Sequence, residues 1–141
     1  MTVELSQTIE IAAAPEAVWR FIADPEKRAQ AISVVQEYEA VGPQKAIWHV
    51  ELPIPLVRQT IPITTTETDR EPPEYVRFTG RSSAVTVIGE HELEPMPTGT
   101  TLTNTFSVTG KLPGVERFFR RNLDRELSNI EAALQKELNR C

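Results

Sequence analysis

The sequence has 141 residues and a formal net charge of −5, from 15 lysines and arginines against 20 aspartates and glutamates. This length suits one ordinary domain, and we expect residues 1–141 to form it. A composition of 40% hydrophobic and 25% charged residues is typical of a globular chain and excludes a disordered one. The excess of acidic residues disfavours binding of nucleic acid.

Several features of the sequence bear on where the protein resides. Its apolar runs are all shorter than the roughly 20 residues that a membrane helix needs. The opening MTVELSQTIEI lacks the basic and apolar regions of a signal peptide. The one cysteine, Cys141, cannot form an internal disulfide, which suits a reducing compartment. We therefore expect a cytoplasmic protein. We also expect it to be a monomer or a weak homodimer.

The first part of the chain predicts a strand followed by two short helices. Apolar and polar residues alternate from Val3 to Ile11, which is typical of a half-buried strand. Pro15 suits the first position of a helix, and an apolar stripe at helical spacing follows, formed by Val18, Trp19 and Ile22. Asp24 and Pro25 then form a second helix-start signal, for a helix that extends to about Ile32.

The middle of the chain, residues 34–109, predicts strands throughout. Turn signals rich in glycine, proline and serine divide it at residues 42–43, 71–74, 82–83 and 95–99. Two neighbouring strands carry opposite charges on one face, which predicts cross-strand charge pairs on the wet side of a sheet. These residues are Arg77 and Arg81 on one strand and Glu90, Glu92 and Glu94 on the next.

The last segment predicts one long helix from Val115 to Arg140, after Pro113 and Gly114. Its apolar residues recur at steps of three and four, at Val115, Phe118, Phe119, Leu123, Leu127, Ile130, Leu134 and Leu138. About 25 helical residues span roughly 37 Å, enough to cross a sheet. The fold class is therefore α+β: a helix-grip architecture, with a curved seven-stranded antiparallel sheet, two short helices and one long C-terminal helix.

Three segments carry a family resemblance: TIEIAAAPEAVWRFIADPEKRAQAI, TETDREPPEYVRFTG and GTTLTNTFSV. With them the sequence resembles the SRPBCC superfamily, which includes START lipid-transfer domains, the birch-pollen allergen family and polyketide cyclases. Within it the sequence looks most similar to the CoxG family, which is associated with carbon monoxide dehydrogenase. The resemblance implies a deep groove between the long helix and the concave sheet. Many CoxG relatives continue into an additional tail, whereas this sequence ends at Cys141, so a membrane anchor is not implied here.

No catalytic or cofactor motif stands out in the sequence. It contains no G-x-G-x-x-G, Walker loop, C-x-x-C, H-E-x-x-H or G-x-S-x-G pattern, and we expect neither a cofactor nor a metal site. His49 and Glu51 have a spacing that could bind a metal. They lie on the face opposite Trp48 and Val50, and we interpret them as solvent-exposed polar residues.

Four polar residues are predicted on the concave face of the sheet. Alternation places His91 and Asn104 there on neighbouring strands, with Gln59 and Thr65 further along. Buried polar groups need hydrogen-bond partners. His91 and Asn104 could contact a ligand, or they could satisfy each other or a trapped water. A third possibility is catalysis by His91 as a general acid or base.

The leading hypothesis is binding or carriage of a hydrophobic small molecule in the groove, such as a lipid, a quinone or a polyketide-like compound. The predicted ligand-binding residues are Trp48, Gln59, Ile61, Ile63, Phe78, His91, Asn104, Phe106, Leu127 and Ile130.

Two alternatives remain open. One is a polyketide cyclase- or dehydratase-like enzyme that uses His91. Glu67 is only a marginal inward candidate for the second acid or base, so we favour binding over catalysis. The other alternative comes from the resemblance, which implies an accessory protein to a CO-dehydrogenase-like oxidoreductase.

The segment from Arg117 to Arg125 carries a stripe of arginines beside Phe118 and Phe119. It could contact a protein partner or a membrane surface peripherally. Alternatively, pairs such as Glu116 with Arg120, and Asp124 with Arg121, make it a salt-bridged solvent face, which is the interpretation we favour.

Overall fold

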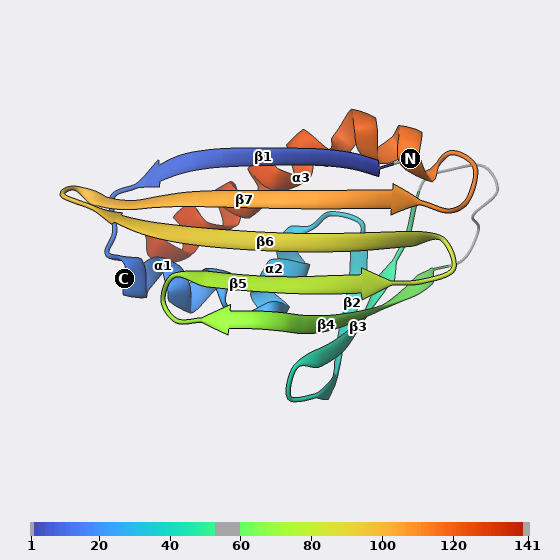
Figure 1. Cartoon of the computed structure of the whole chain (residues 1–141), viewed down its shortest axis with the longest axis horizontal. Coiled ribbons are helices and arrows are strands. Elements are labelled where there is room, and N and C mark those ends of the chain that lie inside the picture. Colours follow the sequence, from blue (N-terminus) through green and yellow to red (C-terminus); the bar gives the residue numbers. More distant parts are fainter. Residues whose placement is uncertain (1, 53–59, 140–141) are drawn as a thin grey trace.

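The computed structural model describes residues 2–52 and 60–139. The elements, in chain order, are β1 (Thr2–Ile11), α1 (Pro15–Ile22), α2 (Pro25–Ala31), β2 (Val35–Gly42), β3 (Lys45–Val50), β4 (Ile61–Glu71), β5 (Tyr75–Arg81), β6 (Val85–Met96), β7 (Gly99–Gly110) and α3 (Val115–Leu138). The seven strands form one antiparallel sheet in the order β1-β7-β6-β5-β4-β3-β2 (Figure 1). The predicted α+β helix-grip fold is confirmed.

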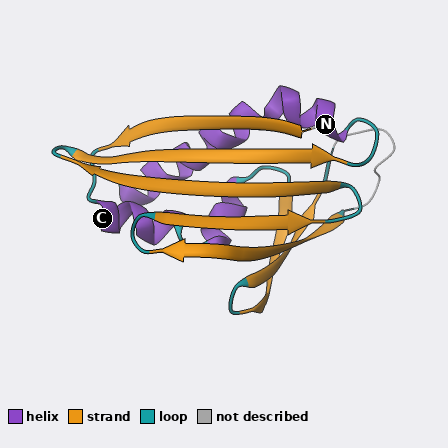
Figure 2. Ribbon diagram, viewed as in Figure 1, coloured by secondary structure: helices purple, strands orange, loops and turns teal. Residues whose placement is uncertain are grey.

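The three helices all lie on one side of the sheet, and α3 crosses it obliquely (Figure 2). The hairpin of β2 and β3 turns away from the direction of the other strands, which curves the sheet around the helices (Figure 1). The predicted apolar face of α3 points into the core. Its fully or nearly fully buried members are Val115, Phe119, Leu123, Leu127, Ile130 and Leu134.

The short helices begin where their proline signals predict. Pro15 and Pro25 occupy the first turns, and the Asp24 side chain accepts hydrogen bonds from the backbone N–H groups of Glu26 and Lys27. The buried face of α1 differs by one residue from the prediction, because Phe21 packs in the core together with Val18 and Ile22. Trp19 is only partly buried, and the Arg70 guanidinium lies 5.5 Å from the centre of its ring.

The charge pairs predicted on the outer face of the sheet do not form. Arg77 lies opposite Glu90 in the register, but its Nη1 donates to Thr68 Oγ1 at 2.9 Å. Glu90 accepts instead from the Tyr75 hydroxyl, at 2.7 Å. Arg81 faces Thr86, because the register of the hairpin brings no acidic residue opposite it. The outer face is therefore polar without being held by ion pairs at these positions.

In the two described ranges, none of the helices combines the length and apolar character that crossing a membrane requires.

Candidate functional site

An apolar groove opens between the first half of α3, the segment joining α2 to β2, and the concave face of the sheet. Its lining residues are Ile32, Val34, Val35, Trp48, Val50, Ile63, Val87, Phe106, Val108, Phe119, Leu123 and Glu126. The cavity volume is about 30 Å³, which is room for one or two water molecules. Three of the predicted ligand-binding residues line it, namely Trp48, Ile63 and Phe106.

One carboxylate, that of Glu126, stands in the wall of this groove. The residue is 3% exposed, and its Oε1 accepts from the backbone N–H of Ser33 at 2.9 Å and from Asn129 Nδ2 at 3.0 Å. Its Oε2 accepts from the Ser33 hydroxyl at 2.7 Å. Glu126 therefore ties α3 to the segment between α2 and β2, beside the groove.

Glu126 is absent from the site residues predicted from the sequence, although a signal is present. It lies three residues after Leu123 and four before Ile130, at the spacing of the buried face. A charged residue at such a position needs hydrogen-bond partners, and Ser33 supplies two donors.

A second depression, the polar recess, lies on the other side of Trp48. It is lined by Pro25, Arg28, Tyr38, Gly42, Pro43, Gln44, Lys45, Ala46, Trp48, Thr65, Glu67 and Phe78. Its cavity volume is also about 30 Å³. Trp48 lines both depressions. Thr65, predicted to face inward, does so and donates its hydroxyl to the Ala46 carbonyl at 3.1 Å.

Arg28 is the buried cation of the polar recess. It is 3% exposed, its Nη1 donates to the Ile22 carbonyl at 2.7 Å, and its guanidinium carbon lies 5.1 Å from the centre of the Phe78 ring. Burial lowers the pKa of Arg28 to about 10, against the raising effect of the Glu67 charge. The side chain therefore remains protonated at neutral pH.

Glu67 does point inward, but its charge is already paired. Arg70 holds its carboxylate with two hydrogen bonds, from Nε at 3.0 Å and from Nη2 at 2.6 Å. Arg70 Nη2 also donates to the Ala23 carbonyl at 2.8 Å, which fixes the pair against the end of α1. Both oxygens of this carboxylate thus accept a hydrogen bond from the same cation.

His91 and Asn104 lie in the core, each with no exposed surface. His91 Nδ1 and Asn104 Oδ1 are 2.6 Å apart, and the amide oxygen can only accept, so Nδ1 carries the proton. Within the described residues, His91 Nε2, Asn104 Nδ2 and the Oε1 of Gln7 have no hydrogen-bond partner. The mutual hydrogen bond is thus present, and contact with a ligand stays a prediction.

The protonation of His91 is strongly disfavoured. Burial lowers its pKa to about 3, the Arg28 charge acts in the same direction, and the hydrogen bond to Asn104 opposes them. The ring is therefore neutral at physiological pH, and neither the apolar groove nor the polar recess touches it.

The remaining predicted ligand-binding residues fall into three groups. Phe78 lines the polar recess. Ile61, Leu127 and Ile130 are buried but line neither depression. Gln59 lies outside the described residues.

His49, which the sequence places on the outer face, has a partly exposed side chain between two carboxylates. Its Nε2 is 3.4 Å from Glu39 Oε1 and 4.0 Å from Glu37 Oε2, whereas Glu51 is not among its partners. In the described part of the chain, no three histidine, cysteine or acidic side chains are grouped closely enough to hold a metal ion.

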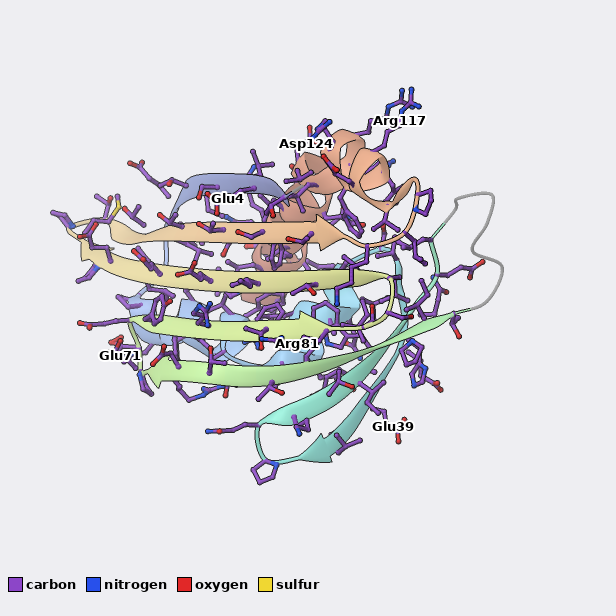
Figure 3. All side chains as sticks on the ribbon, turned by 45° about the vertical axis from the view of Figure 1, so that its right-hand side comes forward. Glu4, Glu39, Glu71, Arg81, Arg117 and Asp124 are labelled. Atoms are coloured by element: carbon purple, nitrogen blue, oxygen red, sulfur yellow. The ribbon has the colours of Figure 1, made fainter. Side chains whose placement is uncertain are left out.

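The arginine-rich start of α3 faces solvent, and Figure 3 shows Arg117 and Asp124 pointing away from the sheet. Glu116 and Arg120 form the predicted ion pair. Asp124 instead accepts from the backbone N–H of Arg125 at 2.8 Å. One of the two expected pairs is therefore present.

The family model described as "Polyketide cyclase / dehydrase and lipid transport" matches residues 2–135. The chain belongs to this family. No curated protein sequence matches this family member.

Solved structures share its fold at low sequence identity. A conserved protein from Geobacillus kaustophilus is 23% identical, with 97% of this chain and 95% of that chain covered and a TM-score of 0.77. An aromatase/cyclase from Streptomyces sp. R1128 is 16% identical, with 99% and 95% covered and a TM-score of 0.76. A START superfamily protein from Mycobacterium smegmatis is also 16% identical, with 96% and 97% covered and a TM-score of 0.76.

The family match confirms the predicted superfamily, and the solved structures share its fold. The finer resemblance, to the CoxG family, stays a prediction.

Proposed function

We propose that the protein binds a hydrophobic small molecule, such as a lipid, a quinone or a polyketide-like compound, in the apolar groove beside α3. The observation that carries this proposal is the lining, in which Glu126 is the one charged residue that the described part of the chain contributes among apolar side chains. Both oxygens of the Glu126 carboxylate accept hydrogen bonds, from Ser33 and Asn129, so this polar group has partners within the protein. Replacing water on such an apolar surface by an apolar molecule lowers the free energy, which favours binding.

The size of the groove sets how binding takes place. Its cavity of about 30 Å³ is far smaller than the roughly 300–1,000 Å³ of typical ligand pockets. A ligand therefore has to widen the groove by displacing side chains or the segment between α2 and β2. Burying about 300 Å² of apolar ligand yields roughly 7 kcal/mol, from which association subtracts at least about 4 kcal/mol. Modest affinity follows unless polar contacts add to it.

A cyclase- or dehydratase-like reaction has less support from the geometry. His91 is neutral, fully buried and separate from both depressions, and the inward carboxylate of Glu67 is engaged by Arg70. An accessory role beside a CO-dehydrogenase-like oxidoreductase stays a prediction from the resemblance. So does contact of the Arg117–Arg125 segment with a protein or a membrane.

The proposal can be tested by filling the groove with a larger apolar side chain. Val35 lines the groove and is only half-buried, so Val35→Phe should add bulk at the opening. Val41 lies on the same strand, is 47% exposed and lines neither depression, which makes Val41→Phe the matched control. The probe is N-phenyl-1-naphthylamine, a neutral apolar dye whose fluorescence rises in dry surroundings.

We expect saturable binding by the unchanged protein and by Val41→Phe, and at least fivefold weaker binding by Val35→Phe. Native mass spectrometry of gently purified protein should also detect a co-purified apolar molecule. Equal affinities in all three proteins, or no saturable binding of this dye and of other apolar probes, would contradict the proposal.

A further inference from the structure

The polar recess contains a buried cation, Arg28, that makes few hydrogen bonds within the protein. The Arg28 guanidinium has five N–H groups. Within residues 2–52 and 60–139 it makes one hydrogen bond, from Nη1 to the Ile22 carbonyl. Its Nε is buried and has no partner there. Leaving the Nε–H of Arg28 unpaired is costly, because this atom is buried and water does not reach it.

The nearest acidic side chain does not balance the charge of Arg28. Glu67 Oε1 lies 3.9 Å from Arg28 Nη2, which is beyond hydrogen-bonding distance, and the same oxygen lies 2.6 Å from Arg70 Nη2. Arg28 and Arg70 thus both face this carboxylate, but only Arg70 lies within hydrogen-bonding distance of it. Glu67 carries one negative charge against the two positive charges of Arg28 and Arg70, and the Asp24 charge acts on Arg28 from outside the recess.

The carboxylates outside the recess have other partners. Asp24 caps the start of α2 and accepts from the backbone of Glu26, while the Glu26 carboxylate accepts from Gln30 Nε2 at 3.2 Å. Two further residues with donor groups, Tyr38 and the exposed Lys45, line the recess together with Arg28 and Glu67. The chemistry gathered there is that of a receptor for an oxygen atom with negative charge.

We propose that the polar recess binds the acidic oxygen of the ligand through Arg28, so that the ligand is an amphipathic organic acid. This inference rests on the proposed function, since the apolar groove would hold the rest of the molecule. Trp48 lines both depressions, so a ligand that occupies them together passes its indole ring. The carboxylate or a similar anionic group supplies the acceptor that the unpaired Arg28 donors lack.

The test compares 1-pyrenebutanoate with its methyl ester, which has the same apolar body and no charge, by fluorescence titration at pH 7.5. We expect the acid to bind at least tenfold more tightly than the ester. A net charge of −5 repels the acid at long range, so such a preference would have to come from a local site. Arg28→Gln should abolish the preference and leave the affinity for the ester unchanged. Arg20→Gln, which removes an exposed arginine from α1, is the control and should keep it.

Arg28 also donates to the Ile22 carbonyl, so a loss of fold in Arg28→Gln would look like a loss of binding. The second readout therefore uses the unchanged protein. The Nε–H resonance of Arg28 in a nitrogen-15 spectrum should shift when the acid is added and stay in place with the ester. Equal affinity for acid and ester, with no selective shift, overturns the inference and leaves the groove proposal intact. Absence of binding by both probes overturns the two together.

Discussion

His91 is a histidine whose surroundings favour only its neutral form. The rings of Phe78 and Phe106 lie 6.3 Å and 5.9 Å from its own, measured between centres, and its residue has no exposed surface. Its one hydrogen bond, to Asn104, cannot offset this burial, and the positive charge of Arg28 adds to the cost of protonation. The result is a pKa of about 3, well below the ordinary value near 6.5.

This shift predicts that His91 makes the protein less stable in acid. Below about pH 6.5 the unfolded chain binds a proton at His91, whereas the folded protein does not until about pH 3. The free energy of unfolding therefore falls as the pH drops through this window, by up to about 1.4 kcal/mol per pH unit. Between pH 7.5 and 5.0, the unchanged protein should lose about 2 kcal/mol more than His91→Gln in urea unfolding.

A substitution that removes no titratable group provides the control for this experiment. Gln36 lies at an exposed position of β2. Gln36→Ala should therefore lose as much stability in acid as the unchanged protein. If His91→Gln lost as much stability in acid as the unchanged protein, His91 would have to accept a proton in the folded state. The low pKa assigned to its buried ring would then be wrong.

The buried polar residues that sequence reasoning finds differ physically from those that it misses. His91 and Asn104 are correctly predicted in the interior, because strand alternation fixes the face of each residue whatever its polarity. Arg28 and Glu126 escape prediction because charged residues are almost always exposed, and burial depends on partners distant in sequence. For Glu126 that partner is Ser33, 93 residues away, and no local pattern shows such a contact.

At the scale of elements, alternation and turn signals predict most strand ends to within a few residues, but none of the predicted turn signals marks the end of β3 or the start of β4. The long helix is predicted from Val115 and begins there. The narrowness of the groove could not be predicted, because it depends on how rings from different strands fill the concave face. Gly89 on β6 lies between Phe78 on β5 and Phe106 on β7 in the register. The two rings cover the space that a side chain at this glycine would need.

Gly89→Ala is therefore expected to destabilise the sheet. A Cβ atom there would lie 2.2 Å from Phe78 Cε1 and 2.7 Å from Phe106 Cε1, so both rings would have to move. Overpacking of this kind costs typically about 1–3 kcal/mol, measurable by urea unfolding. Gly42→Ala is the control, because its Cβ would meet its nearest neighbour at 3.7 Å, an ordinary contact. Equal free energies of unfolding for the two variants would show that the Phe78 and Phe106 rings can move away from a Cβ atom at no cost in stability.

At the scale of the whole molecule, side chains fill most of the space between α3 and the concave face of the sheet. The two depressions that flank Trp48 have cavity volumes of about 30 Å³ each, so neither admits a ligand of ordinary size as it stands. The groove lies where α3 meets the segment between α2 and β2, and the hydrogen bonds of Glu126 hold these two parts together. Opening at this junction is the movement that would admit a ligand.

Binding should then be limited by opening when the ligand is abundant. In stopped-flow mixing with N-phenyl-1-naphthylamine, the observed rate should level off as the dye concentration rises. Glu126→Ala removes the two bonds from Ser33 and the one from Asn129, and so should raise this plateau severalfold. Glu131→Ala, at a partly exposed position of the same helix, should leave it unchanged. A rate that rises linearly with dye concentration, and is the same in all three proteins, would mean that the groove admits its ligand without opening at this junction.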